Sequence, residues 1–200
     1  ISVTTSPGTP VVVGITGASG AELARATVDA LLDSGTPVIA SASSASRLVW
    51  EHELDESFGA ALERWTDTGL FTYHPPTQLN ASIASGSLAT RGMAIVPCSM
   101  ATAAAVAHGF ADNLIRRAAD VCIKEKRPLV LVPRETPLSA IHLENLTSLA
   151  RLGVTILPPE PPFYLRELTV DRIVDYIAHR VIVALGLADA MPETFRYDGP

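Results

Sequence analysis

The sequence predicts an α/β fold in which helices cover both faces of a mostly parallel β-sheet, giving a three-layer sandwich. Short apolar runs of strand type alternate along the chain with segments whose apolar residues recur at helical spacing. Three of these runs end in a turn that leads into helix-compatible sequence, at Thr16–Gly20, Pro97–Ser99 and Arg134–Pro137. Parallel strands that are joined by crossover helices produce this alternation.

The first half of the chain contains the clearest strand, turn and helix. The predicted elements are a strand over Val11–Ile15, a helix over Ala21–Leu32, a strand over Pro37–Ala40, a turn and cap over Ser41–Ser46, and a helix over Arg47–Glu53. Gly35 ends the first helix, because glycine tolerates the left-handed backbone of a helix C-terminus. From Asp55 to Ile83 the pattern is weaker, with a helix around Ala60–Trp65 and a loop through Pro75-Pro76.

The second half repeats the alternation more regularly. The predicted strands are Met93–Val96, Leu129–Val132 and Val154–Leu157, and the predicted helices are Ala101–His108, Asn113–Lys126, Leu138–Leu152 (after a start at Thr136-Pro137) and Val170–Leu187. We therefore expect a Rossmann-like or flavodoxin-like three-layer sandwich. It forms a single domain over residues 11–187, with a flexible leader at 1–10 and a tail at 188–200.

Composition excludes several classes of function. Net charge is −6 and the only lysines are Lys124 and Lys126, so duplex DNA or RNA has no basic patch on which to bind. The apolar fraction is 48% and the charged fraction only 18%, which suggests apolar surface buried between subunits of a homo-oligomer.

Cysteine usage and the absence of long apolar segments indicate a cytoplasmic protein. Cys98 and Cys122 are the two cysteines of a chain that needs no disulfide, no secretory signal pattern opens the sequence, and no run is apolar enough to span a membrane. The histidines have no ligand-type spacing, so no metal site is predicted; they are His52, His74, His108, His142 and His179.

The carboxyl ends of the strands are expected to bind a phosphate-bearing ligand. Arg134 and Glu135 follow a strand directly, and the turns beside them offer backbone N–H groups and hydroxyls. A site of the NAD type would need G-x-G-x-x-G after the first strand and an acidic residue after the second. The first turn reads GITGASG instead, and the second strand ends in the small hydroxylated residues Ser41 and Ser43. FMN is thus favoured over NAD.

Six segments together resemble the UbiX-type flavin prenyltransferase family over roughly residues 11–187. The segments are GITGASGA, ASGS at 84–87, PCSM at 97–100, DNLIRRAADVCIKEKRPLVLVPRETPL at 112–138, IHLENL at 141–146 and PPFY at 161–164. The resemblance implies an enzyme that joins a dimethylallyl group, taken from dimethylallyl monophosphate, to N5 and C6 of reduced FMN without a metal. It also implies that the product, prenylated FMN, serves a UbiD-type decarboxylase.

The same resemblance implies a set of site residues. FMN would be held by Gly17, Ala18, Ser19, Ser43, Ser99, Met100, Ala101, Thr102 and Arg134. The prenyl phosphate would be held by Arg117, Lys124, Tyr164 and Arg180, some of them from a neighbouring subunit. Cationic donors such as Lys124 stabilise the negative charge of the departing phosphate, which makes Lys124 catalytic. Glu53 and Glu135, with the retained phosphate, are the candidates for acid and base work.

Several alternatives stay open at this stage. Glu51 or His52 could face the site in place of Glu53, and Arg116 in place of Arg117. Some family members carry a tryptophan where this chain has Leu79, and the candidates for the missing aromatic face are Trp50, Phe195 and Tyr197.

Two other functions compete with the prenyltransferase. An FMN-dependent decarboxylase of cysteine-type thiols would show Pro-Ala-Ser-Ala-Asn-Thr where this chain has Pro97 to Thr102, and a base histidine for which only His52 is available. An FMN-binding electron carrier would have no use for a second phosphate clamp. The choice between a monophosphate and a diphosphate donor stays open.

Overall fold

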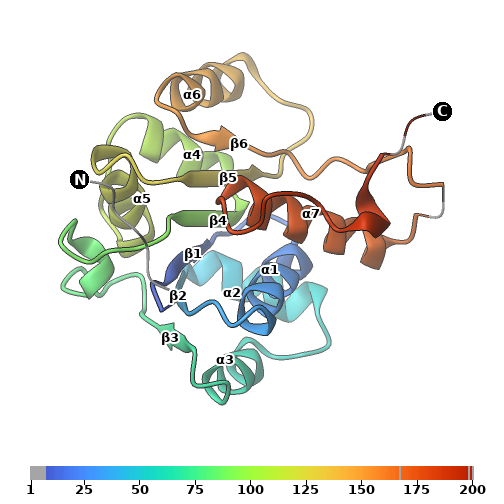
Figure 1. The fold of residues 1–200 in the computed structure, drawn as a ribbon. Coiled ribbons are helices and arrows are strands. Elements are labelled where there is room, and N and C mark those ends of the chain that lie inside the picture. The colour runs from blue at the N-terminus through green and yellow to red at the C-terminus, as the bar shows by residue number, and fades with distance from the viewer. Residues whose placement is uncertain (1–7, 167, 198, 200) are drawn as a thin grey trace.

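The computed structural model describes residues 8–166, 168–197 and 199, and over these residues the chain forms one six-stranded sheet. The strand order is β3-β2-β1-β4-β5-β6 and the neighbouring strands pair in parallel (Figure 1). The strands are β1 Val11–Ile15, β2 Val38–Ala42, β3 Phe71–Tyr73, β4 Met93–Cys98, β5 Leu129–Pro133 and β6 Thr155–Ile156. Because the order changes direction between β1 and β4, a crevice is expected at the carboxyl ends of these two strands.

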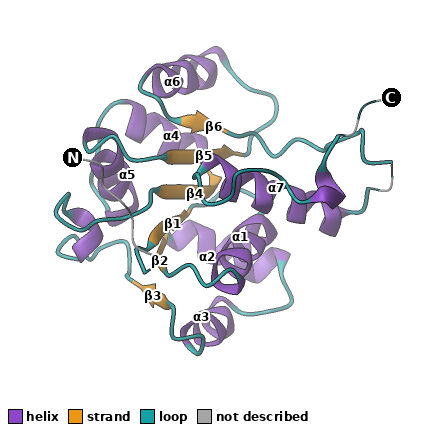
Figure 2. Ribbon diagram, viewed as in Figure 1, coloured by secondary structure: helices purple, strands orange, loops and turns teal. Residues whose placement is uncertain are grey.

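Helices cover both faces of the sheet, as the sequence predicts (Figure 2). One apolar core joins the sheet to α1 Ala21–Asp33, α2 Ser44–Glu53, α3 Phe58–Thr66 and α7 Val170–Ala184. The other core joins it to α4 Met100–Ala107, α5 Leu114–Lys124, α6 Ala140–Arg151 and the 3₁₀ turn η1 Ser82–Ala84. The strand side chains alternate between the two cores; Val11 and Val13 belong to the first, and Val12 to the second.

Nearly every α-helix has a polar side chain at its N-cap position. The N-cap residues whose side chains accept a hydrogen bond from a backbone N–H are Ser43, Ser57, Ser99, Asn113, Ser139 and Thr169. The exception is α1, whose N-cap Gly20 has φ 114° and no side chain to offer. The positive end of α1 therefore needs an acceptor from another part of the chain.

Several of the sequence-based element boundaries need correction, including the start of α2, which lies at Ser44 rather than at Arg47. Strand β3 was not predicted, because it is only three residues long and lies at the sheet edge. Ser41 and Ala42 belong to β2 rather than to the turn that follows it. Helix α6 begins at Ala140 and not at Thr136-Pro137, since Ser139 and His142 form a capping box there. Helix α7 ends at Ala184, where the prediction ran to Leu187.

The ends of the chain fall partly outside the described residues. Of the predicted leader at residues 1–10, residues 1–7 lie outside them. In the predicted tail, the 3₁₀ turn η2 Glu193–Phe195 lies beside α7 (Figure 1). Within the described residues, every helix falls short of the length and apolar character that crossing a membrane requires.

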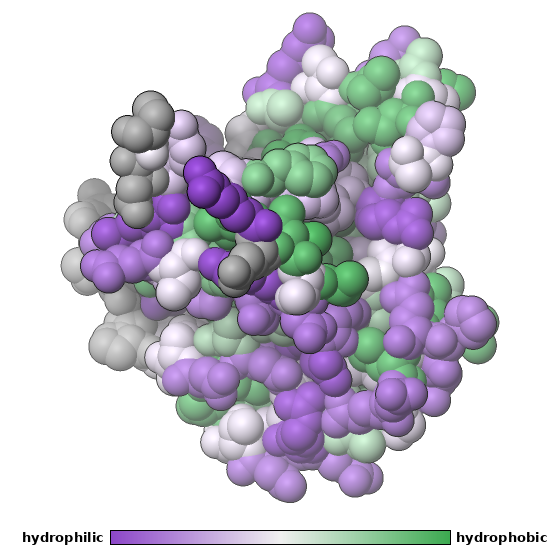
Figure 3. Space-filling model, turned by 90° about the vertical axis from the view of Figure 1, so that its right-hand side faces the viewer, coloured by the Kyte–Doolittle hydropathy of each residue, from purple (hydrophilic) through white to green (hydrophobic). Residues whose placement is uncertain are grey.

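Large apolar side chains are exposed at several positions. They include Phe163 at 80%, Val170 at 73%, Ile141 at 69% and Tyr197 at 67%. Figure 3 faces the side of the molecule from which α7 and the tail project, and apolar residues are more frequent in its upper half than in its lower half. Surface of this kind suits contact with another protein chain.

Candidate functional site

The turns that follow β1, β2, β4 and β5 are bonded to one another at the carboxyl edge of the sheet. Thr16 is at the centre: its Oγ1 donates to Pro97 O at 2.8 Å and accepts from Ser99 N at 2.7 Å. Ser43 N donates to Ile15 O at 3.0 Å, which ties the second turn to the first. Arg134 N donates to Cys98 O at 3.2 Å. The predicted FMN-binding turns are therefore one connected structure.

The first turn approaches α2 so closely that only glycine fits at position 17. A Cβ on Gly17 would lie 2.4 Å from Ala45 Cβ, a distance that side chains essentially never reach. The following residues stay in the turn, where Ala18 N donates to Thr16 O at 2.9 Å. Gly17 therefore fixes how close the turn comes to the start of α2.

Free donors gather at this edge. Thr102 N and Ala103 N are satisfied by Ser99, which leaves the N–H groups of Met100 and Ala101 without an acceptor among the described residues. They lie at the positive end of α4, where an anion is favoured. The Arg134 guanidinium likewise has no acceptor within hydrogen-bonding distance in the described part of the chain. Two N–H groups, a guanidinium and the hydroxyls of Ser43 and Ser99 suit a phosphate-bearing group such as FMN.

Glu53 joins this edge from the last turn of α2. Its Oε2 accepts hydrogen bonds from Gly20 N at 2.9 Å and Ala21 N at 2.8 Å, and it thereby caps α1, which lacks a cap of its own. Partial burial raises the pKa of Glu53. Hydrogen bonds from Ser19, Ala21 and Gly20 and the charge of Arg134 lower it by more, so the pKa lies below the ordinary value of a glutamate. Glu53 is therefore a carboxylate at neutral pH.

The neighbours of Glu53 point elsewhere. Glu51 Oε1 accepts from Phe58 N at 3.0 Å and so caps α3, away from the strand ends. His52 is exposed and makes no hydrogen bond within the described residues. Of the three positions left open by the sequence, the structure brings only Glu53 to the turns.

Glu135 lies at the same edge but stays exposed. Its Oε1 accepts from Thr136 N at 3.0 Å. Among the described residues it forms no ion pair with Arg134, so the two charges after β5 are both available to a ligand.

Tyr164 lies in a cluster of aromatic rings beneath the tail. Its Oη donates to Phe195 O at 3.1 Å and lies 3.5 Å from Tyr176 Oη. Burial, the Tyr176 hydrogen bond and the Tyr176 charge together raise the pKa of Tyr164 to about 12, although the nearby Arg180 opposes the shift. The tyrosine is therefore a neutral hydrogen-bond donor, and the exposed Arg180 guanidinium lies close to it.

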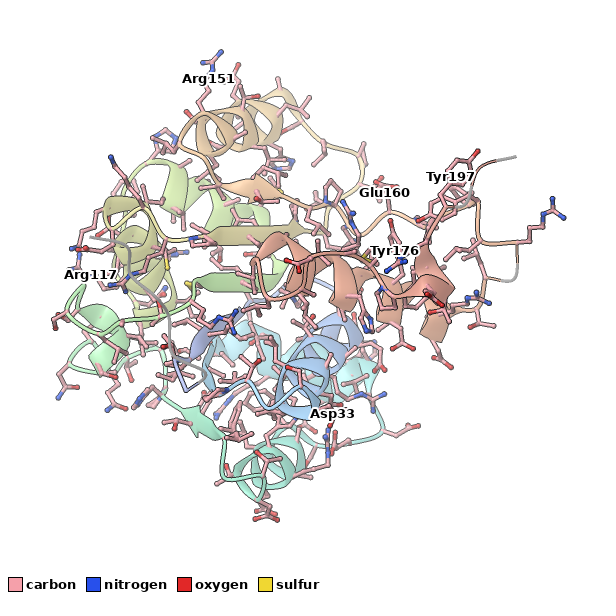
Figure 4. All side chains as sticks on the ribbon, in the orientation of Figure 1. Asp33, Arg117, Arg151, Glu160, Tyr176 and Tyr197 are labelled. Carbon is pink, nitrogen blue, oxygen red and sulfur yellow. The ribbon has the colours of Figure 1, made fainter. Side chains whose placement is uncertain are left out.

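Arg117 and Lys124 are not brought to the carboxyl edge. Helix α5 runs back toward the start of β5, so Lys124 lies toward the amino edge of the sheet, with Arg117 two turns before it. Figure 4 shows Arg117 at the opposite end of the molecule from Tyr176 and Tyr197. Within one chain the phosphate-binding set predicted from the sequence is therefore split in two.

The segment Ala84–Ser87 lies beside this half of the set. Arg117 Nε donates to Ala84 O at 3.0 Å. Lys124 Nζ forms an ion pair with Glu125, and both side chains lie against Gly86. Arg116 instead pairs with Asp112, so Arg117 is the arginine on the Lys124 side. From the sequence, Ala84–Ser87 is indicated only by the family resemblance. The glycine between two serines is the signal that could have marked this segment as part of a site.

Of the three aromatic side chains considered in place of a tryptophan at Leu79, one remains. Trp50 is fully buried in the core and its Nε1 donates to Glu56 O at 2.9 Å. Phe195 is buried between Tyr176 and His179, with ring centroids 5.8 and 5.5 Å away. Tyr197 is 67% exposed, and its ring lies edge-on to Tyr164 at 5.5 Å.

The described residues offer neither a reactive thiol at Cys98 nor a group of metal ligands. Burial raises the pKa of the Cys98 thiol to about 12, so this cysteine stays protonated and is a poor nucleophile. Across residues 8–166, 168–197 and 199, no three His, Cys, Asp or Glu side chains are grouped as metal ligands would be.

Known proteins resemble this chain in both sequence and structure. The chain matches the family described as Flavoprotein over residues 2–182. A flavin prenyltransferase UbiX from Chlamydia muridarum is 45% identical over 190 residues, which cover 94% of this chain and 97% of that protein. The structure of a dodecameric FMN-dependent UbiX-like decarboxylase from Escherichia coli O157:H7 has a TM-score of 0.86 at 42% identity, covering 95% of this chain and 100% of that one.

A further solved structure carries ligands. AnUbiX (PadA1), in complex with FMN and dimethylallyl pyrophosphate, has a TM-score of 0.88 at 36% identity. The match covers 96% of this chain and 98% of that one. These similarities extend over nearly the whole chain.

The capping of α1 by Glu53 predicts how stability depends on pH. We expect Glu53→Gln to lower the free energy of unfolding at neutral pH by up to about 1 kcal/mol, the usual contribution of a carboxylate at a helix N-terminus. Because folding lowers this pKa below 4.5, the contribution is complete above that value and is lost as pH falls through the folded-state pKa.

Urea unfolding of both proteins over a pH series measures the difference. The gap between them should shrink toward zero in acid. A gap that persisted at the lowest pH would mean that the carboxylate charge does not stabilise α1.

Proposed function

The chain belongs to the Flavoprotein family and is a close relative of the UbiX flavin prenyltransferases, and from this premise we propose its reaction and its site. The protein joins a dimethylallyl group, taken from dimethylallyl monophosphate, to N5 and C6 of reduced FMN. The observation that carries the proposal is the set of connected turns at the carboxyl edge, whose N–H groups and guanidinium have no acceptor among the described residues, in a chain of this family. The prenylated FMN serves a UbiD-type decarboxylase.

FMN lies across the carboxyl ends of the strands. Its phosphate is bound by the hydroxyls and N–H groups of the turns and by Arg134. The binding residues are Gly17, Ala18, Ser19, Ser43, Ser99, Met100, Ala101, Thr102 and Arg134. The reduced flavin supplies the two ring positions that become alkylated.

The second phosphate site serves the departing group. Breaking the allylic carbon–oxygen bond leaves negative charge on the phosphate, and Arg117, Lys124 and Arg180 are cations that stabilise this charge as it forms. Tyr164, neutral at physiological pH, donates a hydrogen bond to the same phosphate. No metal is needed, because fixed cationic donors already supply the positive charge.

Glu53 acts as a proton acceptor rather than as a donor. A carboxylate whose pKa lies below 4.5 is ionised at neutral pH and takes the proton that must leave C6. Its bonds to Gly20 and Ala21 hold it beside the flavin-binding turn. Glu135, exposed at the same edge, and the retained phosphate are the remaining candidates for proton transfer.

The complete site is shared between subunits. Arg117 and Lys124 lie at the other end of the sheet from Arg134, so they reach a prenyl phosphate only from a neighbouring chain. Exposed apolar residues such as Phe163, Ile141 and Val170 offer surface for assembly, and the E. coli relative is dodecameric. We therefore propose a cytoplasmic homo-oligomer of one flavin-binding domain over residues 11–187.

Tyr197 supplies the aromatic face that Leu79 lacks. Its exposed ring lies beside Tyr164, the tyrosine proposed to bind the phosphate, while Trp50 and Phe195 are buried. An aromatic face stabilises positive charge on the prenyl carbons and packs against the dimethylallyl group.

The mass of the flavin product tests the reaction directly. Incubation of the oligomer with reduced FMN and dimethylallyl monophosphate, without oxygen, should yield FMN heavier by one dimethylallyl unit. The diphosphate, tested in parallel, decides which donor is used. Unmodified flavin together with decarboxylation of a cysteine-type thiol would instead support the alternative enzyme. Unmodified flavin with neither activity would support the FMN-binding electron carrier.

Mixed oligomers test whether the site is shared. Lys124→Ala should bind FMN normally but lose affinity for the prenyl phosphate, while Glu53→Gln should bind both ligands and turn over slowly. When the two variants are co-expressed with different tags, random mixing should restore about a quarter of wild-type activity, since that fraction of sites receives both intact residues. Mixed oligomers that stay inactive would mean that both residues serve a site within one chain.

Removal of the Tyr197 ring tests its role. Tyr197→Ala should raise KM for dimethylallyl monophosphate by roughly threefold to tenfold, because an aromatic contact contributes about 0.5–1.5 kcal/mol. Tyr197→Phe keeps the ring and should behave like the wild type. Equal KM values for the alanine variant and the wild type would show that the prenyl group packs elsewhere.

A further inference from the structure

The segment Ala84–Thr90, here called the serine loop, is tied to α5 by arginine side chains. Arg117 donates to Ala84 O, as described above. Past the other end of α5, Arg127 Nη2 donates to Gly86 O at 2.6 Å and Arg127 Nη1 donates to Leu88 O at 2.7 Å. Arg127 Nη1 also lies 3.4 Å from Thr90 Oγ1. One guanidinium thus holds two carbonyl groups of the loop backbone.

Gly86 is the point at which the serine loop contacts the proposed phosphate clamp. A Cβ on this residue would lie 2.2 Å from Glu125 Oε1 and 2.8 Å from Lys124 Nζ. The backbone conformation does not require glycine here, because φ is not in the left-handed region. A side chain at this position would have to displace the ends of the Lys124 and Glu125 side chains, which lie against the loop backbone.

Arginine is suited to this task in a way that lysine is not. The planar guanidinium directs its N–H groups in a fixed fork, so one side chain can hold two carbonyl groups at once. Arg127 is partly buried and has no carboxylate within salt-bridge distance among the described residues, so its charge is directed at the loop carbonyls. Hydrogen bonds from a charged donor to a neutral acceptor are stronger than neutral ones.

We propose that Arg127 is a positioning residue for the prenyl-phosphate clamp, an inference that rests on the proposed function. By holding Gly86 and Leu88, it keeps the serine loop against Lys124 and so fixes where the Lys124 ammonium points. The flavin-binding turns lie at the opposite edge of the sheet from Arg127. Loss of this tie therefore weakens binding of the prenyl phosphate and leaves FMN binding intact.

The test compares Arg127→Ala and Arg127→Lys with a matched control. Arg91 lines the same cavity of about 580 Å³ as Arg127, but its side chain makes no hydrogen bond to the described residues. Arg91→Ala therefore removes the same charge from the same cavity without releasing the loop. All measurements use the intact oligomer, with its size checked for each variant.

We expect Arg127→Ala to raise KM for dimethylallyl monophosphate about tenfold, the effect of losing charge-assisted hydrogen bonds that fix the clamp. The Kd for FMN should stay within twofold of wild type. Arg127→Lys should have a KM close to that of Arg127→Ala, since an ammonium cannot reach both carbonyls. Arg91→Ala should have the wild-type KM.

A second variant reaches the same contact from the other side. Gly86→Ala leaves Arg127 in place but displaces the ends of the Lys124 and Glu125 side chains, and should also raise KM for dimethylallyl monophosphate. A lowered Tm with unchanged KM in Arg127→Ala, or an equal rise of KM in Arg91→Ala, would overturn the positioning role. A wild-type protein that fails to prenylate FMN would overturn the proposed function instead, so the two failures are distinguishable.

Discussion

The parallel direction of all the strands is the constraint on which the rest of the structure depends. It places the turns after β1, β2, β4 and β5 at one edge, where Thr16 and its neighbours bond them together. It also obliges each crossover helix to run back, so the charged end of α5 lies toward the opposite edge. A ligand that needs both sets of groups is therefore bound only where chains meet.

Helix α1 couples the flavin-binding turn to the proposed base. Gly17 must lack a side chain to approach Ala45, and the N-cap residue Gly20 has none either, so neither offers a side-chain oxygen to the helix start. Glu53 from α2 takes that place. These two N–H groups also lower the pKa of Glu53, so the contacts that cap α1 keep the carboxylate ionised.

Two irregular segments adjoin the residues proposed to bind the prenyl phosphate, and both are held by side chains that donate to backbone carbonyls. Arg117 and Arg127 hold the serine loop, and Tyr164 holds the tail at Phe195. Such segments lack a regular backbone ladder, so a few donors decide their position.

The sequence by itself determined the layered fold, the turns that face the ligand and the family, because strand and helix periodicities and the turn motifs are local properties of the chain. It also placed Arg134 beside those turns, since this residue directly follows a predicted strand, whereas Glu53 was indicated only by the family resemblance. Only the tertiary structure showed that Glu53 and not Glu51 lies at the turns, and that Arg117 and not Arg116 bonds to the serine loop. It also showed that Tyr197 is exposed, whereas Trp50 and Phe195 are buried. It also separated Lys124 from Arg134. These choices depend on contacts between segments far apart in sequence, which no local pattern encodes.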